Sequence, residues 1–250
     1  MLAQRIKPKA LMCWSGGKDS SMALQRASSD YEITGLLTTL NAEFKRISMH
    51  GVREELLDAQ AQAIGLPIIK VWVSAGSNTE YEQQMRQALE TAKAEGVTHV
   101  IFGDIFLQDL REYREKHLAK VGLTAVFPLW QFDTTELISE FIASGFQTIT
   151  CCINDGYLDA HWAGSEINQQ FIDALPATVD PCGENGEYHT FCYAGPIFNS
   201  PVRFKVGEVV YRPLDIPMPV TAVQQADDDQ YMYSSPVQTK GFWFCELLPA

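Results

Sequence analysis

The fold of this chain is decided by a short stretch, Ser15-Gly16-Gly17-Lys18-Asp19-Ser20, which directly follows the apolar run Ala10-Leu11-Met12-Cys13-Trp14. The apolar run predicts a strand, and the two glycines predict a turn into a helix that opens at Ser20. Such a turn leaves a row of backbone N–H groups unpaired, and these groups bind anions. The glycines let the main chain approach a phosphate, Lys18 adds a mobile positive charge, and the two serines add hydroxyl donors.

Two familiar phosphate-binding loops do not fit this stretch. A Walker A loop needs a glycine at position 12 and a serine or threonine directly after the lysine, whereas this chain has Met12 and Asp19. The G-x-G-x-x-G run of a dinucleotide-binding turn is not present in the sequence either. An ordinary Gly-Gly turn is the plainer alternative, and the position between a strand and a helix counts against it.

Strand and helix patterns alternate through the first half of the chain. Strands are expected at 10–14, 33–40, 67–73 and 99–102, and helices at 20–29, 52–64, 79–95 and 108–120. Because alternating strands and amphipathic helices form parallel sheets covered on both faces, we predict a doubly wound α/β fold. Ligands of such sheets bind at the carboxyl ends of the strands, where Ser15–Ser20, the segment after Leu40 and Gly103-Asp104 then lie together.

The second half has the pattern of a smaller α+β unit. After a strand at 124–127, Asp133 and Glu136 are placed to cap a helix that stops at Gly145. A strand to Ile153, a helix at 165–175 and strands at 202–211 and 241–248 follow, the last two flanking an acidic stretch at 213–236. We place a domain boundary near residue 128, which gives a nucleotide-binding domain at 1–128 and a C-terminal domain at 129–250.

Composition narrows the class of protein. The 250 residues carry a formal net charge of −12, which counts against a broad nucleic-acid surface. One predicted helix is rich in basic residues, but interleaved glutamates favour a solvated face; the basic residues are Arg111, Arg114, Lys116 and Lys120. The apolar runs are too short for a membrane span or a signal segment, so we expect a cytoplasmic protein with no membrane partner.

The cysteines show no metal-binding or disulfide pattern. The six thiols form no C-x-x-C pair and no zinc-type spacing with histidine, which favours reduced cysteines. Cys151 and Cys152 are adjacent and suggest a redox pair. They lie in a strand-like run, however, where alternation is expected to bury one and expose the other.

A second polar stretch reads Asp180-Pro181-Cys182-Gly183-Glu184-Asn185-Gly186-Glu187-Tyr188-His189-Thr190. It shows no apolar period, so we interpret it as a loop. Its two glutamates and its histidine suit acid/base catalysis, metal ligation or binding of an amine. The plainer alternative is a surface loop whose side chains are only solvated.

Together the two stretches resemble the diphthine-ammonia ligase family of PP-loop, or N-type, ATP pyrophosphatases. Ser15–Ser20 is similar to the SGGxDS phosphate loop of that superfamily, and 183–190 is similar to the glutamate-rich loop that separates this family from its other members. The likeness covers most of residues 10–200 and looks like the bacterial branch of the family. It is also carried by His50-Gly51-Val52-Arg53, Gly103-Asp104, Arg111, Pro128-Leu129-Trp130 and Gly195-Pro196-Ile197-Phe198.

The resemblance implies an adenine nucleotide alpha hydrolase-like (HUP) fold and an ATP-dependent amidation. A carboxylate acceptor, either a small molecule or a protein, attacks the α-phosphate, pyrophosphate leaves, and ammonia displaces AMP. The residues implied for ATP are Ser15, Gly16, Gly17, Lys18, Asp19, Ser20, Thr39, Gly103 and Asp104, with Mg²⁺ at Asp19. Those implied for the acceptor are His50, Arg53, Arg111, Gly183 and Thr190, and those for catalysis are Lys18, Glu184, Glu187 and His189.

Several alternatives stay open at this stage. His50 and Arg53 could form a local helix cap and not a binding site, and Ser165 stands where the family usually has an arginine, so that it could cap the next helix. The acidic residues 227–229 lie outside the family's familiar core. A PP-loop enzyme that modifies tRNA and a non-catalytic ATP-binding regulator are the competing functions, and a homodimer is an open possibility.

Overall fold

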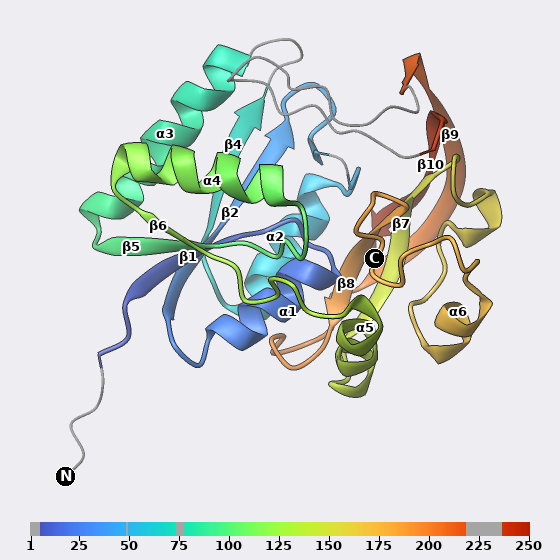
Figure 1. Ribbon diagram of the computed structural model, residues 1–250, viewed down its shortest axis with the longest axis horizontal. Coiled ribbons are helices and arrows are strands. Elements are labelled where there is room, and N and C mark those ends of the chain that lie inside the picture. The colour runs from blue at the N-terminus through green and yellow to red at the C-terminus, as the bar shows by residue number, and fades with distance from the viewer. Residues whose placement is uncertain (1–5, 49, 74–77, 219–236) are drawn as a thin grey trace.

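The computed structural model of this protein describes residues 6–48, 50–73, 78–218 and 237–250. Its first sheet has five parallel strands, with β1 at the centre, β2 and then β4 on one side, and β5 and then β6 on the other. The strands are β1 (Lys9–Cys13), β2 (Glu32–Asn41), β4 (Ile68–Val73), β5 (Val97–Ile101) and β6 (Thr124–Val126). The predicted parallel sheet is therefore confirmed (Figure 1).

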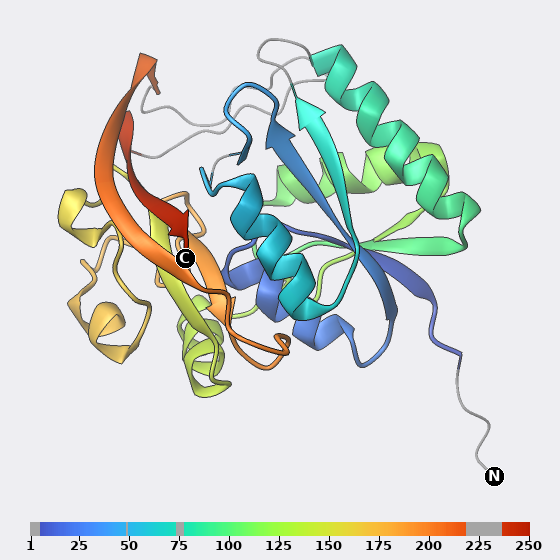
Figure 2. The ribbon, with the colours of Figure 1, turned by 180° about the vertical axis from the view of Figure 1, so that it is seen from behind.

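Helices cover both faces of this sheet because its central strand is apolar on both. Successive residues of β1 point to opposite faces, so that Met12 joins one core cluster and Leu11 the other. The first cluster packs under α1 (Lys18–Ala27) and α2 (Glu54–Ile64), and the second under α3 (Asn78–Ala94) and α4 (Gln108–Val121). Figures 1 and 2 show these two helix pairs on opposite faces of the sheet.

A second, antiparallel sheet lies beside the α1 and α2 layer, with the strand order β8-β7-β10-β9 (Figure 2). Its strands are β7 (Gln147–Asn154), β8 (Tyr188–Ala194), β9 (Phe204–Met218) and β10 (Thr239–Pro249). The helices of this half are α5 (Thr134–Ala143), the 3-10 turn η1 (Ala160–Trp162) and α6 (Gln169–Ala174). The boundary near residue 128 stays a prediction, since the two sheets share a continuous core cluster.

The short strand β3 (Arg46–Ile47), which the sequence analysis missed, places an important turn. It pairs antiparallel with Leu40 and Asn41 of β2, while β4 occupies the other edge of the same two residues. Because β1 pairs with β2 only as far as Leu37, β3 lies on the side of β1, beyond the end of that strand. His50, which follows β3 in the chain, therefore lies next to the phosphate loop.

Some local expectations are confirmed and others are wrong. Asp133 caps α5, as predicted, by accepting hydrogen bonds from the N–H groups of Thr135 and Glu136. Helix α1 begins at Lys18, two residues earlier than expected. Ser165 does not cap α6, because that helix begins at Gln169 and its cap is the side chain of Asn168. Residues 227–229 lie outside the described residues.

The adjacent thiols of β7 also differ from expectation, since Cys151 and Cys152 are both buried. Strand β7 is interior to its sheet, between β8 and β10, and both of its faces are covered. Burial raises the pKa of both thiols, which makes them poor nucleophiles. All six cysteines are free thiols, as predicted. Every helix in the described part of the chain is too short or too polar to cross a membrane.

Candidate functional site

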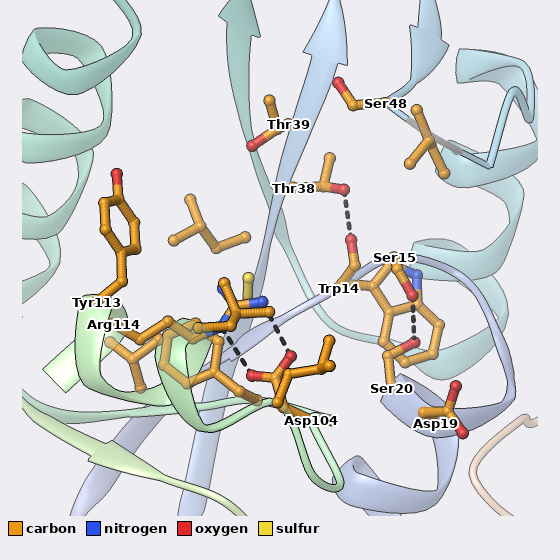
Figure 3. A pocket seen from close by; sticks show the side chains of 18 of the residues that line it. Trp14, Ser15, Asp19, Ser20, Thr38, Thr39, Ser48, Asp104, Tyr113 and Arg114 are labelled. Atoms are coloured by element: carbon orange, nitrogen blue, oxygen red, sulfur yellow. Dashed lines mark hydrogen bonds and ion pairs between the residues drawn. The ribbon is translucent and has the colours of Figure 1, made fainter. Parts of the chain in front are cut away.

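The phosphate loop has the predicted form, a strand that ends in two glycines and turns into a helix. Gly17 is the N-cap of α1 and has no side chain with which to cap the helix. The Lys18 N–H at the start of α1 already donates to Thr190 Oγ1, so an anion at this helix start would bind the remaining N–H groups of the first turn. The Ser15 hydroxyl donates to the Ser20 hydroxyl at 3.2 Å, so both line the same turn (Figure 3). The arrangement fits a polyphosphate.

A buried glutamine that the sequence analysis missed holds this loop in place. The Nε2 of Gln60, on α2, donates to the carbonyls of Gly16 at 2.9 Å and Cys192 at 2.6 Å. Its Oε1 accepts from the Trp14 indole N–H at 3.1 Å. Since Gln60 has an exposed fraction of 0%, these bonds are formed away from water, and leaving one unmade costs about 1–3 kcal/mol. One side chain thus joins α2, the phosphate loop and the second sheet.

Lys18 is less mobile than predicted. Its side chain is only 4% exposed, and Nζ lies 2.7 Å from the Asp19 carboxylate. Burial alone would lower the pKa of Lys18, but the charge and hydrogen bond of Asp19, together with the nearby Cys182 and Glu184, hold that pKa above its usual value. Lys18 therefore stays charged at neutral pH, and Asp19 balances its charge inside the protein.

The second sheet packs directly on the phosphate loop, through Thr190 of β8. The Lys18 backbone N–H donates to Thr190 Oγ1 at 3.0 Å. A Cβ on Gly17 would lie 2.9 Å from His50 Cε1 and 3.0 Å from the Thr190 carbonyl oxygen. A side chain at position 17 has no room even without a nucleotide, so the glycine there is needed for packing between the two sheets as well as for a close approach of phosphate.

A cavity of about 560 Å³ opens beside this loop at the carboxyl edge of the parallel sheet. Three predicted segments meet there: the phosphate loop, the end of β2 and the turn after β5. Figure 3 shows their side chains on opposite walls, with Ser15, Asp19 and Ser20 facing Asp104 and Thr39 above them. The predicted residues that line the cavity are Ser15, Lys18, Asp19, Ser20, Thr39, His50, Gly103, Asp104, Gly183, Glu184, His189 and Thr190.

Helix α4 supplies a wall that the sequence analysis did not foresee. Arg114 does not belong to a solvated charged face, because it pairs with Asp104 at 2.7 Å and lies over the Phe102 ring at 4.3 Å. His117 also lines the cavity. Its Nδ1 donates to the Tyr113 carbonyl at 2.8 Å, and its buried Nε2 has no hydrogen-bond partner among the described residues.

Glu184 joins the two halves of the site. Its Oε1 accepts from the backbone N–H groups of Ile105 at 3.0 Å and Phe106 at 3.2 Å, in the turn after β5. Burial, and secondly the nearby Asp19 charge, raise the pKa of Glu184 to about 7, although the two N–H groups and Lys18 oppose them. Its carboxyl group can therefore gain or lose a proton near neutral pH, as a general acid or base must.

Two histidines lie next to each other over the phosphate loop. The ring centroids of His50 and His189 are 4.7 Å apart. His50 Nδ1 lies 3.1 Å from the Thr190 carbonyl, and because a carbonyl only accepts, Nδ1 carries the proton and Nε2 presents its lone pair. Burial lowers the pKa of His50 to about 4 and that of His189 well below its usual value, so both rings are neutral at pH 7.

The polar stretch at 180–190 is only partly a loop. Residues from Tyr188 onward form β8, and Glu187 before them does not line the cavity. Glu187 is fully buried, and its carboxylate accepts from the Asp180 N–H at 2.9 Å, the Asn185 N–H at 2.8 Å and Asn185 Nδ2 at 2.9 Å. This placement favours a role of Glu187 in holding the loop together. A catalytic role for this residue stays a prediction.

We expect Glu187→Gln to destabilise the protein. Glutamine has one acceptor oxygen in place of two, so its amide nitrogen would face an N–H donor at a buried position. The expected loss is about 1–3 kcal/mol in the free energy of unfolding, measured by urea denaturation. Glu115→Gln, which removes a half-exposed carboxylate, is the control and should change little. An unchanged midpoint for Glu187→Gln would show that the loop does not depend on it.

Two predicted acceptor residues lie outside the cavity. Arg53 pairs with Glu246 of β10 at 3.0 Å, and Arg111 pairs with Glu115 at 2.8 Å. The Arg111 guanidinium also lies over the Trp130 ring at 4.6 Å, so these two residues, which both contribute to the family resemblance, contact each other. Neither arginine lines the cavity, so the expectation that they contact the acceptor has no support in the geometry.

Asp19 is the one predicted metal ligand. Among the described residues, no group of three or more His, Cys, Asp or Glu side chains is arranged to hold a metal ion. Mg²⁺ in nucleotide sites commonly takes one or two carboxylates together with phosphate oxygens. Asp19, at the first turn of α1, has the chemistry for that role.

The sequence matches two models of known families. Residues 8–125 match the family described as the diphthamide synthase N-terminal domain, and 133–213 match the diphthamide synthase C-terminal domain. Several proteins named diphthine–ammonia ligase are similar to this chain along most of their own length. The one from Danio rerio is 27% identical over 230 residues, which cover 82% of this chain and 90% of that protein. Those from Bos taurus and Homo sapiens are 26% and 25% identical, with 82% of this chain and 86% of each relative covered.

One solved structure is also similar. It is described as a predicted subunit of a tRNA methyltransferase from Methanocaldococcus jannaschii, and it aligns over 57% of this chain and 80% of its own with a TM-score of 0.40 and 16% identity. A TM-score of 0.40 is too low to support an argument about the fold, so the fold is described from this chain's own sheets.

Proposed function

This chain belongs to the diphthamide synthase family, and from that membership we propose that it is an ATP-dependent ligase that converts a carboxylate into an amide with ammonia. The observation that carries the proposal is the meeting of two segments in one cavity, the phosphate loop and the Glu184–Thr190 segment. A chain that only bound ATP would need the first segment and not the second. The relative named diphthine–ammonia ligase from Danio rerio is similar to this chain over 82% of the chain's length, which supports the proposal.

The first step forms an activated acyl group. The acceptor carboxylate oxygen attacks the α-phosphorus of ATP, the bond from that phosphorus to the bridging oxygen breaks, and pyrophosphate leaves. The N–H groups of the phosphate loop and the charge of Lys18 stabilise the negative charge that develops on the departing pyrophosphate. Mg²⁺, held at Asp19, would add charge neutralisation at the same phosphates. In this proposal the adenine base binds between the end of β2 at Thr39 and the turn at Gly103 and Asp104, which line the cavity.

The second step forms the amide. The nitrogen of ammonia attacks the acyl carbon, the bond from that carbon to the AMP oxygen breaks, and the nitrogen loses a proton. Glu184 lines this cavity and has a pKa raised to about 7, so it is suited to take that proton. His189 and His50 are neutral and present acceptor groups, so they can orient an ammonium or ammonia molecule without repelling it.

This division of roles has an electrostatic reason. Carboxylates repel a triphosphate but attract an ammonium ion, which places Glu184 on the side of the amine. Gly183 and Thr190 flank that side and are assigned to the acceptor. Glu187, Arg53 and Arg111 are left outside the proposed chemistry, since they do not line the cavity.

We expect turnover to yield AMP and pyrophosphate, and not ADP and phosphate. The reason is that the phosphate loop is of the PP-loop kind and not Walker A, so the α-phosphate is the attacked centre. The measurement is chromatography of the nucleotide products, with a panel of small carboxylates and ammonium as substrates. ADP as the sole nucleotide product of an active enzyme would contradict the proposal.

Two competing functions have distinct outcomes in the same assay. A tRNA-modifying enzyme would release pyrophosphate only when tRNA is added, and a regulator would bind ATP and never produce AMP. The net charge of −12 counts against the first, and the pKa of Glu184 near 7 at the cavity counts against the second. The acceptor, a cytoplasmic location and a homodimer stay predictions.

A further inference from the structure

The turn that carries His50, described at residues 46–48 and 50–53 and called the 46–53 hairpin below, lies at the edge of the cavity. The Ile47 N–H donates to the Val52 carbonyl at 2.8 Å, and the Gly51 N–H donates to the Ile47 carbonyl at 3.0 Å. His50 lies at the tip of this hairpin and packs on Gly17 of the phosphate loop. The position of this ring therefore depends on how firmly the hairpin is held.

The C-terminal strand holds the base of this hairpin with one carboxylate. Arg46 Nη2 donates to the two Glu246 oxygens at 2.7 and 2.9 Å, and Arg53 Nη2 donates to one of them at 3.0 Å. Arg46 Nη1 also donates to the Gly51 carbonyl at 2.7 Å. The Glu246 side chain is 18% exposed, so water screens this cluster only in part.

A second contact from the same strand meets the hairpin near its tip. Gly51 has φ +69°, and a Cβ on it would lie 2.7 Å from the Phe244 ring. Phe244 and Glu246 are two residues apart on β10, so they point to the same face of the sheet. One face of the C-terminal strand therefore touches the hairpin at two places, an apolar one near His50 and a charged one at its base.

We propose that Glu246 is a positioning residue of the nucleotide site, which acts through Arg46 and Arg53 to keep the 46–53 hairpin and its His50 ring against the phosphate loop. Glu246 lies beyond residue 213, where the family match ends, so this chain completes its site with a segment outside the matched region. The measurement of ATP affinity assumes the proposed function, because it requires that this site binds ATP. The protonation state of the His50 ring can be measured without that assumption.

The plain alternative is that the three charges only add stability. Exposed ion pairs contribute little, and such a pair would affect unfolding without affecting the site. The distinguishing feature here is geometric. Both arginines belong to the hairpin itself, and Arg46 also bonds the backbone carbonyl next to His50, at Gly51. We therefore expect the loss of Glu246 to loosen the hairpin more than it loosens the second sheet.

The test is Glu246→Gln, which keeps the shape of the side chain and removes its charge. We expect its ATP affinity in calorimetry to fall about five- to tenfold. We also expect the ¹⁵N signals of His50 to move from a single Nδ1-protonated tautomer towards a mixture. Glu140→Gln is the matched control, because Glu140 pairs with Arg26 at 2.6 Å and joins α1 to α5 away from the cavity. It should change neither measurement.

A double-mutant cycle decides whether the effect passes through His50. In a His50→Ala background, Glu246→Gln should cause less than a twofold further loss of ATP affinity. The proposal is overturned if Glu246→Gln lowers the unfolding temperature but leaves ATP affinity and the His50 signals unchanged, or if its full effect persists without His50. Arg46→Gln repeats the test if the first variant does not fold. If the parent protein binds no ATP, the proposed function fails, and the His50 signals still decide the positioning role.

Discussion

Lys18→Met should lower the affinity for ATP about ten- to hundredfold. The variant keeps the apolar stem, which fills a buried position, and removes the charge that we propose stabilises the pyrophosphate. A charge-assisted hydrogen bond of this kind contributes about 1.5–3 kcal/mol, and every 1.4 kcal/mol is about tenfold in affinity. Asp19 adds to the loss, because its carboxylate then stays near the phosphates without the ammonium group that lies 2.7 Å from it in the parent.

Calorimetry with ATP and Mg²⁺ measures this loss, and Lys70→Met is its matched control. Lys70 is partly buried and, like Lys18, ion-paired, to Glu54 at 2.7 Å and Asp58 at 2.6 Å, but it does not line the cavity. The control separates the loss of a paired lysine from the loss of a nucleotide contact. Equal ATP affinity in Lys18→Met and the parent, with both proteins folded, would remove Lys18 from the site.

Glu184→Gln should lower amide formation by about a hundredfold or more and leave ATP affinity within a few-fold of the parent. Glutamine can still accept from the Ile105 and Phe106 N–H groups through Oε1, so the turn after β5 keeps its place. What is lost is a group that takes a proton, and positioned proton transfer contributes about 10²–10⁴-fold to a rate. The effect is therefore on turnover and not on binding.

The pH dependence gives a second measurement of the same role. Burial raises the pKa of Glu184 to about 7, so the deprotonated form that acts as a base accumulates as the pH rises through about 7. The parent rate should increase over that range at a constant concentration of free ammonia, and the Glu184→Gln variant should not show this step. Glu166→Gln is the control, because Glu166 accepts from the Tyr193 hydroxyl at 2.6 Å outside the cavity. A step near pH 7 that survives in Glu184→Gln would assign the base to another group.

Most of the fold could be predicted from local patterns. The β1 strand is apolar on both faces, helices α2 and α5 have polar starts and glycines beyond their ends, and the glycine pair turns the chain at Ser15–Ser20. Each of these features depends on residues a few positions apart. Backbone geometry and side-chain alternation act at that range, so the sequence shows them directly.

The misses share one cause, which is that they depend on burial, and burial is set by the packing of the whole chain. The pattern of α4 suggested a solvated helix, but Asp104 and Phe102 draw Arg114 into the cavity. The many polar residues of 180–190 suggested a catalytic loop. The two carboxylate oxygens of Glu187 instead accept hydrogen bonds from three donors within that loop. Gln60 carries no motif at all, and only its burial beside the phosphate loop shows its role.

The sequence by itself determined the parallel sheet, the phosphate loop and the family, because these follow from short-range patterns and from motifs read in order. The tertiary structure alone decided which of the candidate side chains share one cavity. Thr190 meets the Lys18 N–H across 172 positions of sequence, and Glu246 meets Arg46 across 200. Contacts over such separations arise from the packing of one sheet against the helices of another, and packing depends on the shape and burial of the whole chain, which no local pattern encodes.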